Sequence, residues 1–190
     1  MAKLKETPSQ TAGPFVHIGT LPEIAGLRAQ ARAQNKLAGA DTPGERIRIH
    51  GSITDGAGAL VKDAMVEIWQ ADANGQYGSN AFLGFGRAAT DFETGLFTFE
   101  TIKPGPTPFH DGRKQAPHIA VAIFARGVNL HLQTRLYFAD EAAANAKDPV
   151  LALVGDPGQV ATLIAQAEGA GTYRFDIRLQ GERETVFFDF

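Results

Sequence analysis

The chain of 190 residues contains no cysteine. This absence excludes a disulfide scaffold, a thiolate nucleophile, and any zinc or iron–sulfur site with cysteine ligands. A metal site, if the chain had one, would depend on oxygen and nitrogen ligands.

The sequence also lacks an excess of one charge and a long apolar run. Its 18 basic and 21 acidic residues nearly balance, and no Lys/Arg cluster suggests a nucleic-acid partner. No apolar run approaches the length of a membrane span, and residues 1–8 have no apolar segment typical of a signal peptide. We therefore expect a cytoplasmic protein that binds neither nucleic acid nor membrane.

Several catalytic motifs are missing as well. The sequence has no Gly-x-Ser-x-Gly, no P-loop, no Gly-x-Gly-x-x-Gly and no His-Glu-x-x-His. Acyl hydrolase, nucleotide-binding and zinc protease functions therefore have no motif to support them.

What is present is a period-two pattern that begins after an arm rich in Pro, Gly and Ala. From residue 45, Ile47 and Ile49 alternate with polar residues, and turn signals such as Asp55-Gly56 recur. The pattern predicts an all-β fold: a two-sheet antiparallel β-sandwich over residues 45–190, with short helical insertions and an N-terminal arm over residues 1–44.

Individual elements can be predicted within that fold. A long hairpin is expected from residues 118–125 and 130–138, around a turn with Gly127 and Asn129. The other expected elements are strands at 47–54, 64–70, 96–100, 173–179 and 184–190, the last buried on both faces, and helices at 24–31, 140–147 and 156–167.

Two residues are candidates for chemistry, although each has an ordinary structural interpretation. Tyr77 follows a predicted strand, where a single tyrosine is usually a half-buried ring. His118 begins a predicted strand, where a lone histidine is more often a core residue than a ligand. Residues i and i+2 of a strand share a face, so a His-x-His pair could bind one metal ion, but Ala120 occupies the second position.

Taken together and in order, five segments resemble the intradiol ring-cleavage dioxygenase family. They are Thr7-Pro-Ser-Gln-Thr-Ala-Gly-Pro-Phe15, Val66-Glu-Ile-Trp-Gln-Ala71, residues 95–108, Ala116-Pro-His-Ile119 and the terminal residues 181–190. The resemblance extends from about Thr7 to Phe190, nearly the whole chain.

Members of this family hold a mononuclear non-haem Fe(III) with two tyrosines and two histidines. The resemblance assigns these four positions to Tyr77, Thr107, His118 and Ala120, so two ligands are lost. A threonine hydroxyl is too weak an acid to replace a phenolate, and a methyl group cannot bind a metal. We therefore expect that this chain binds no metal and that Fe(III) is held by a homologous β chain.

The resemblance further implies that the chain completes a substrate pocket on that partner. The substrate would be a catechol with a carboxylate, cleaved with O2, and the pairs of chains would form a larger symmetric assembly. The implied substrate-binding residues are Thr11, Ala12, Gly13, Pro14 and Arg126. Without the resemblance, Arg126 would be read as a solvated charge in a turn and the arm as a flexible segment.

Two other interpretations are compatible with the residues. One is a transthyretin-like sandwich that binds a small aromatic ligand without catalysis, with Tyr77, His118 and Arg126 in its pocket. The other is an independent metalloenzyme that adds Asp91 or Glu93 to Tyr77 and His118.

Overall fold

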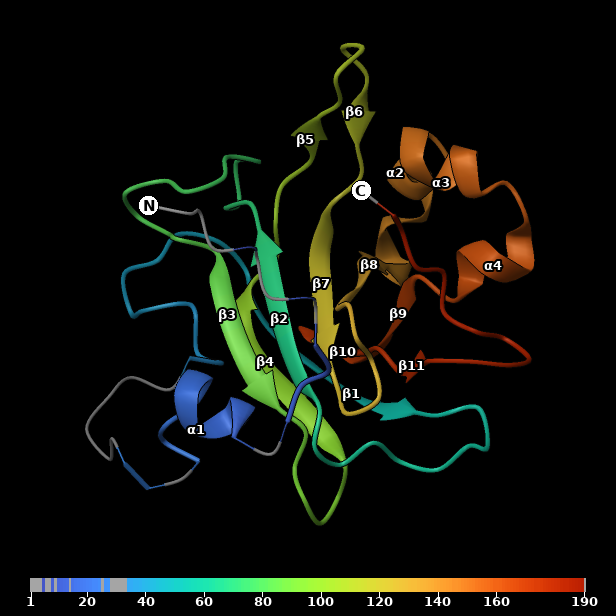
Figure 1. Cartoon of the computed structure of the whole chain (residues 1–190). Helices are drawn as coiled ribbons and strands as arrows, with labels where there is room; N and C mark the ends of the chain where they lie inside the picture. The colour runs from blue at the N-terminus through green and yellow to red at the C-terminus, as the bar shows by residue number, and fades with distance from the viewer. Residues whose placement is uncertain are drawn as a thin grey trace.

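The computed structural model describes residues 5, 8, 10–13, 15–24, 26, 27 and 34–189. Strands dominate this part of the chain, and the helices are short (Figure 1). The elements in order are α1 (Val16–Thr20), β1 (Arg46–Thr54), β2 (Met65–Gln70), β3 (Phe85–Ala89), β4 (Leu96–Ile102), β5 (Thr107–Pro108), β6 (Lys114–Gln115), β7 (His118–Phe124), β8 (Leu132–Phe138), the 3-10 helix η1 (Ala139–Glu141), α2 (Ala142–Asn145), α3 (Pro149–Val154), α4 (Pro157–Ala161), β9 (Ile164–Gly169), β10 (Thr172–Arg174) and β11 (Ile177–Arg178).

The strands form two layers that are joined along one side. One layer has the order β4-β1-β10-β9 and the other β8-β7-β2-β3, while β9 pairs with both β8 and β10. The predicted all-β sandwich with short helices is confirmed. Most strand pairs are antiparallel, but β1 pairs in parallel with β10 and β11, and β8 pairs in parallel with β9.

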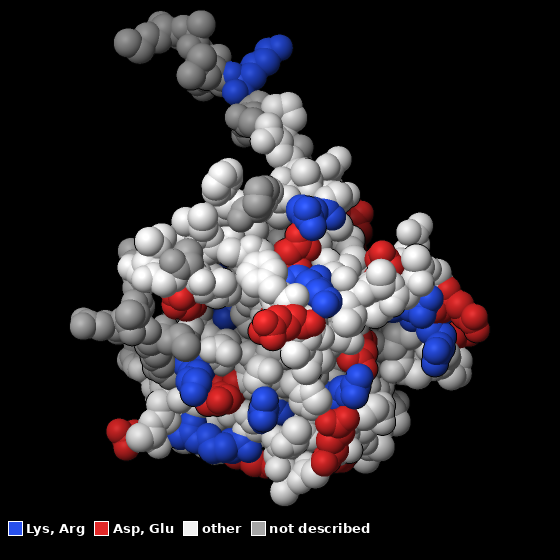
Figure 2. All heavy atoms as spheres, turned by 90° about the horizontal axis from the view of Figure 1, so that it is seen from below, with Lys and Arg blue, Asp and Glu red and all other residues white. Residues whose placement is uncertain are grey.

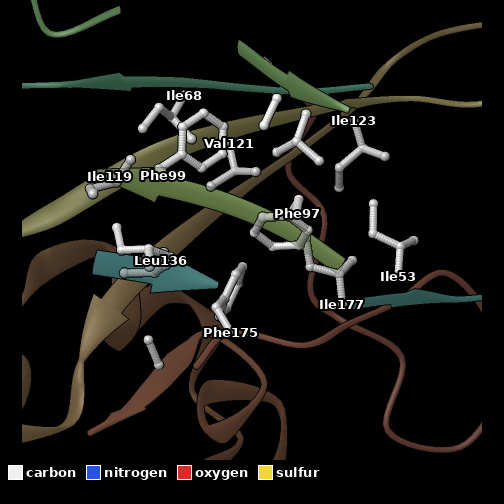
Figure 3. Close-up of a cluster of buried hydrophobic side chains, with 14 of the residues drawn as sticks. Ile53, Ile68, Phe97, Phe99, Ile119, Val121, Ile123, Leu136, Phe175 and Ile177 are labelled. Carbon is white, nitrogen blue, oxygen red and sulfur yellow. The ribbon is translucent and has the colours of Figure 1, made fainter. Parts of the chain in front are cut away.

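The core lies between the two layers. The alternation predicted for the first strand is confirmed, because Ile47, Ile49 and Ile53 of β1 are buried. Figure 3 shows Phe97 and Phe99 of β4 lying among aliphatic side chains of the other layer. Apolar burial of this kind contributes about 25 cal/mol per Å² of surface removed from water.

Strand β7 occupies the centre of its sheet. It pairs with β8 as His118↔Tyr137 and with β2 as Met65↔Phe124, both antiparallel. The hairpin predicted from residues 118–125 and 130–138 is therefore confirmed. Its first strand begins at one end of the sandwich and its turn lies at the other (Figure 1).

The helix predicted at 156–167 is wrong beyond residue 161. Asp156 caps α4 as expected, by accepting a hydrogen bond from Gln159 N at 2.9 Å. The chain then forms β9, in which Ile164 pairs with Tyr137. The spacing of apolar residues in this segment fits a helix, but the segment pairs with the open edge of β8 and becomes a strand. The local sequence pattern does not predict this partner, because β8 is distant in the chain.

The helix predicted at 140–147 forms in two short pieces, η1 and α2. Asp140 does not cap it. The Asp140 carboxylate instead accepts hydrogen bonds from Lys103 Nζ and from the Tyr173 hydroxyl, each at 2.8 Å. This cluster ties the insertion to the loop that follows β4.

The predicted C-terminal strand is also corrected. Residues 184–189 form no regular strand and only an isolated bridge, Gln133↔Phe188. Thr185 is buried, whereas Phe187 and Phe188 are only partly buried. Separate hydrogen bonds hold this segment beside β8 and β11, among them those of Thr134 Oγ1 to Val186 O at 2.7 Å and of Thr185 N to Arg178 O at 2.9 Å.

Parts of the N-terminal arm lie on the sandwich itself. Leu21 is 1% exposed, Leu37 packs against the core, and a ring nitrogen of His17 lies 3.4 Å from Ala64 O. Most of the helix expected at 24–31 lies outside the described residues. The boundary at residue 44 and the contact of the arm with a partner chain stay predictions.

Among the described residues, no helix is both long enough and apolar enough to cross a membrane.

We expect Gly51→Ala to destabilise the fold strongly. A Cβ at position 51 would lie 1.8 Å from the carbonyl oxygen of Phe175, where the chain passes between β10 and β11. Because that contact is with backbone, it can be relieved only by separating β1 from its parallel neighbours. Chemical denaturation should show a loss of at least ~3 kcal/mol.

Gly19→Ala is the matched control for this substitution. Gly19 lies in α1 and a Cβ there would meet nothing within 4 Å. Alanine is the better helix former by up to ~1 kcal/mol. Its stability should be unchanged or higher, and an equal loss in both variants would contradict the steric explanation.

Candidate functional site

Tyr77 and His118 come together at the end of the sandwich where β7 begins. The Tyr77 hydroxyl lies 3.5 Å from His118 Nε2, and the Tyr77 ring stacks on Trp69 with centroids 5.9 Å apart. His118 Nδ1 lies 2.8 Å from the carbonyl oxygen of Ala116. A carbonyl only accepts, so Nδ1 carries the proton and Nε2 of the neutral ring faces Tyr77 as an acceptor.

Both side chains are uncharged at neutral pH, and burial of their polar atoms favours that state. It lowers the pKa of His118 to about 4, and the hydrogen bond to Ala116 opposes this shift only in part. Burial also raises the pKa of Tyr77 above its ordinary value, although the nearby charge of Arg135 acts in the opposite direction. Tyr77 is therefore a neutral phenol in this structure.

The other two positions implied by the resemblance carry no ligand. Thr107 is buried in β5, and its hydroxyl accepts a hydrogen bond from Gln115 Nε2 at 3.1 Å. Ala120 lies on β7 two residues after His118, directly across from Arg135 of β8. Arg135 Nη1 donates to Gln115 Oε1 at 2.7 Å. A guanidinium thus stands beside the position where a second histidine would be needed.

These residues do not fit a ferric ion. The described part of the chain contains no cluster of three or more His, Cys, Asp or Glu side chains that could hold a metal. The nearby Arg135 guanidinium already supplies a positive charge, which disfavours a second cation. We call Tyr77, Thr107, His118 and Ala120 the relict ligand positions.

Sequence reasoning missed the polar residues that support this region. The Tyr137 hydroxyl donates to Asp148 Oδ1 at 3.2 Å, and Asp148 Oδ2 accepts from Ala116 N at 2.7 Å. Asp148 is 1% exposed and also caps α3 through the backbone N–H groups of Val150 and Leu151. The dipeptide Asp148-Pro149 is a helix-start signal that could have revealed this cap.

A second group of residues meets at the opposite end of β7. The Thr11 hydroxyl accepts a hydrogen bond from Gly127 N at 2.7 Å and lies 3.4 Å from Ala125 O. The arm is thereby docked on the β7–β8 turn, next to Arg126. Gly13 O accepts a hydrogen bond from Val16 N at 3.1 Å as the chain enters α1. Pro14 lies outside the described residues.

Arg126 forms an ion pair with Asp63, which sequence reasoning also missed. The pairing of β2 with β7 explains the contact: Met65 lies opposite Phe124, so the same register continued by two residues brings Asp63 opposite Arg126. The Arg126 side chain is 70% exposed and that of Asp63 is 26% exposed. We call Thr11, Ala12, Gly13, Asp63 and Arg126 the arginine edge.

The relict ligand positions and the arginine edge are separate sites. His118 and Arg126 are eight residues apart on an extended chain, a span of roughly 26 Å. Figure 2 views the molecule from the end that carries the β7–β8 turn, and basic and acidic side chains are interspersed over it. A single pocket that contains Tyr77, His118 and Arg126, as the transthyretin-like alternative requires, is therefore wrong.

The metalloenzyme alternative also lacks support in the geometry. The Asp91 carboxylate is used in the β3–β4 turn, where it accepts hydrogen bonds from Thr94 N at 2.7 Å and Thr94 Oγ1 at 2.9 Å. Neither Asp91 nor Glu93 belongs to a metal-binding cluster in the described chain.

Comparison with known proteins identifies the family to which this fold belongs. A family model described as "Dioxygenase" matches residues 22–181, and the chain belongs to the intradiol ring-cleavage dioxygenase family. The chain is 54% identical to the protocatechuate 3,4-dioxygenase alpha chain of Pseudomonas putida, with 98% of each chain covered.

More distant relatives include a chain of the other type. The protocatechuate 3,4-dioxygenase beta chain of Burkholderia cepacia is 33% identical over 80% of this chain and 72% of its own length. Among solved structures, the dioxygenase domain of a carbohydrate-binding fusion protein from Streptomyces sp. SirexAA-E has a TM-score of 0.59 at 25% identity, covering 96% of this chain and 100% of that one.

The buried, neutral His118 predicts a loss of stability in mild acid. The unfolded chain takes up this proton near pH 6.5 and the folded chain near pH 4. Between these values the unfolded state binds more protons, so the free energy of unfolding falls as the pH falls, by up to about 3 kcal/mol. Denaturant titrations at pH 7 and pH 4.5 should show this decrease.

His118→Gln should reduce the pH dependence, because glutamine does not titrate. His110→Gln, the same substitution at an exposed position, serves as the control for the change of side chain itself. If the free energy of unfolding depends on pH equally in the wild type and in His118→Gln, then His118 is not the group that causes this dependence.

Proposed function

We propose that this chain is the alpha subunit of a protocatechuate 3,4-dioxygenase. It completes the substrate pocket of an Fe(III) site that its beta subunit carries. The enzyme would cleave 3,4-dihydroxybenzoate between its two hydroxyl-bearing carbons with O2, giving 3-carboxy-cis,cis-muconate in the β-ketoadipate pathway of aromatic degradation. A cytoplasmic location is part of this proposal.

The observation that carries the proposal is the separation of the two ends of β7. At one end, relict ligand positions with Thr107, Ala120 and the adjacent Arg135 do not fit a metal. At the other end, the arm and Arg126 meet on an exposed edge. Such an edge can contribute to a pocket only if a second chain brings the reactive centre to it.

Arg126 is suited to bind the carboxylate of the substrate. A guanidinium offers five N–H donors in a planar fork and pairs with carboxylates through two parallel hydrogen bonds. The substrate carboxylate takes no part in ring cleavage, so Arg126 would bind and orient the ring and would not move protons during the reaction.

The N-terminal residues have two different tasks in this proposal. The Thr11 hydroxyl contacts the backbone of the β7–β8 turn, so Thr11 anchors the arm beside Arg126. Gly13 has open space around its Cα, so a substrate or partner backbone can approach closely there. Ala12 and Pro14 would line the pocket and exclude water.

Exposed apolar side chains support an obligate partner. Phe15 is 75% exposed in the arm, and Leu83 and Leu130 are each 66% exposed. Large exposed hydrophobic residues of this kind are typical of stable protein interfaces. We propose that the arm, residues 1–44, packs on the beta subunit and that the pairs build a larger symmetric assembly.

Metal content and activity test the proposal directly. The chain purified alone should contain no iron and cleave no 3,4-dihydroxybenzoate, whereas co-expression with a beta chain from a close relative should give a complex with both. Elemental analysis and O2 consumption are the measurements. Iron bound by the lone chain would contradict the interpretation of Thr107 and Ala120 as lost ligands.

In the co-expressed complex, Arg126→Ala should raise the KM for 3,4-dihydroxybenzoate about 10- to 150-fold, equivalent to ~1.5 to 3 kcal/mol. The physical reason is the loss of a charge-assisted contact made in both ground and transition states. The matched control is Arg113→Ala, which removes another exposed arginine paired with an aspartate, on the β5–β6 hairpin. Unchanged kinetics for Arg126→Ala would reject the role assigned to this residue.

A further inference from the structure

The ion pair between Arg126 and Asp63 suggests a role for a residue outside the segments that resemble the family. Arg126 lies in a turn and its side chain is 70% exposed, so a long, flexible arginine at this place has many accessible rotamers. The closest contact of the pair joins Arg126 Nε and Asp63 Oδ2. This contact restricts the guanidinium to one side of the turn.

We propose that Asp63 is a positioning residue for substrate binding, which holds the Arg126 guanidinium by its Nε side and leaves its Nη side for the substrate carboxylate. This inference rests on the proposed function and assigns a residue to it. A side-on pair with one carboxylate uses at most Nε–H and one Nη–H, so at least three of the five donors stay available.

The backbone around Asp63 is well fixed, which a positioning residue needs. Ala64, the next residue, is fully buried; its N–H donates to Thr90 Oγ1 at 2.9 Å and its carbonyl accepts from Thr90 N at 2.9 Å. Met65 then enters the β2–β7 ladder. Asp63 therefore directly precedes a residue whose backbone is fixed by hydrogen bonds, whereas Arg126 lies in the β7–β8 turn.

The N-terminal arm connects the two partners from the other side. A ring nitrogen of His17 lies 3.4 Å from Ala64 O, and Thr11 accepts from Gly127 N. Figure 1 shows the blue N-terminal segment passing beside the lower end of β7 before it enters α1. The arm thus touches the residue after Asp63 and the residue after Arg126, and the three segments form one closed set of contacts.

Asp63 also carries a negative charge, which by itself would repel an anionic substrate. The guanidinium would separate the Asp63 carboxylate from the substrate carboxylate, and solvent screens the repulsion between these two charges. By contrast, restricting the motion of the Arg126 guanidinium favours binding directly, because its N–H groups are the atoms that contact the substrate carboxylate. We therefore expect a net loss of affinity when Asp63 is removed.

The test is steady-state kinetics of the co-expressed complex with Asp63→Asn. The KM for 3,4-dihydroxybenzoate should rise about tenfold with kcat little changed, and Asp63→Glu should restore part of the loss. Catechol, which lacks the carboxylate, should show the same kinetic parameters with wild type and Asp63→Asn. Asp111→Asn, which breaks the surface pair with Arg113, is the control and should change neither substrate's KM.

The double variant Asp63→Asn/Arg126→Ala separates this inference from the proposed function. If Asp63 acts through Arg126, the double variant should be no worse than Arg126→Ala alone. An unchanged or lowered KM for Asp63→Asn, together with a raised KM for Arg126→Ala, would overturn the positioning role and leave the proposed function intact. An unchanged KM in Arg126→Ala would instead reject the substrate-binding role of Arg126, on which the positioning role of Asp63 and the proposed function both depend.

Discussion

The antiparallel pairing of β2 with β7 is the constraint on which both ends of this molecule depend. Strand β7 begins with His118 and ends just before the turn that carries Arg126, so one strand links the relict ligand positions to the arginine edge. Its register with β2 puts Asp63 opposite Arg126, and its register with β8 puts Arg135 opposite Ala120. A slip by one residue would turn His118 to the other face and separate the ion pair.

At the relict ligand positions the family's fold is present, but the side chains there do not form a set that fits a metal ion. Tyr77 and His118 face each other, and both are neutral at neutral pH. A tyrosine and a histidine hydrogen-bonded in this way are stable without an ion, because a neutral phenol and a neutral imidazole satisfy each other's polar atoms. The charged groups of this region have hydrogen-bond partners as well: Arg135 donates to Gln115, and Asp148 accepts from Ala116 N.

The arginine edge differs from the relict ligand positions because Arg126 is exposed and the residues there form only part of a site. Thr11, Asp63 and Arg126 come from three segments and meet at the β7–β8 turn. Exposed apolar residues such as Phe15 and Leu130 accompany them. This combination of an ordered charged group with uncovered hydrophobic surface is what one half of a shared site requires, and it agrees with full-length similarity to an alpha chain.

Local patterns in the sequence determined the strands that bury one face, such as β1 with Ile47 and Ile49, and the β7–β8 hairpin, because period-two alternation and turn residues act over a few positions. Together with the family resemblance, the identities of Thr107 and Ala120 led to the expectation that two iron ligands are missing, which stays a prediction. Only the tertiary structure decided that residues 164–169 form a strand, that the C-terminal segment does not, and that Asp63 meets Arg126 and Thr11 meets Gly127. Those outcomes depend on hydrogen bonds and ion pairs between residues far apart in the chain, for which no local pattern exists.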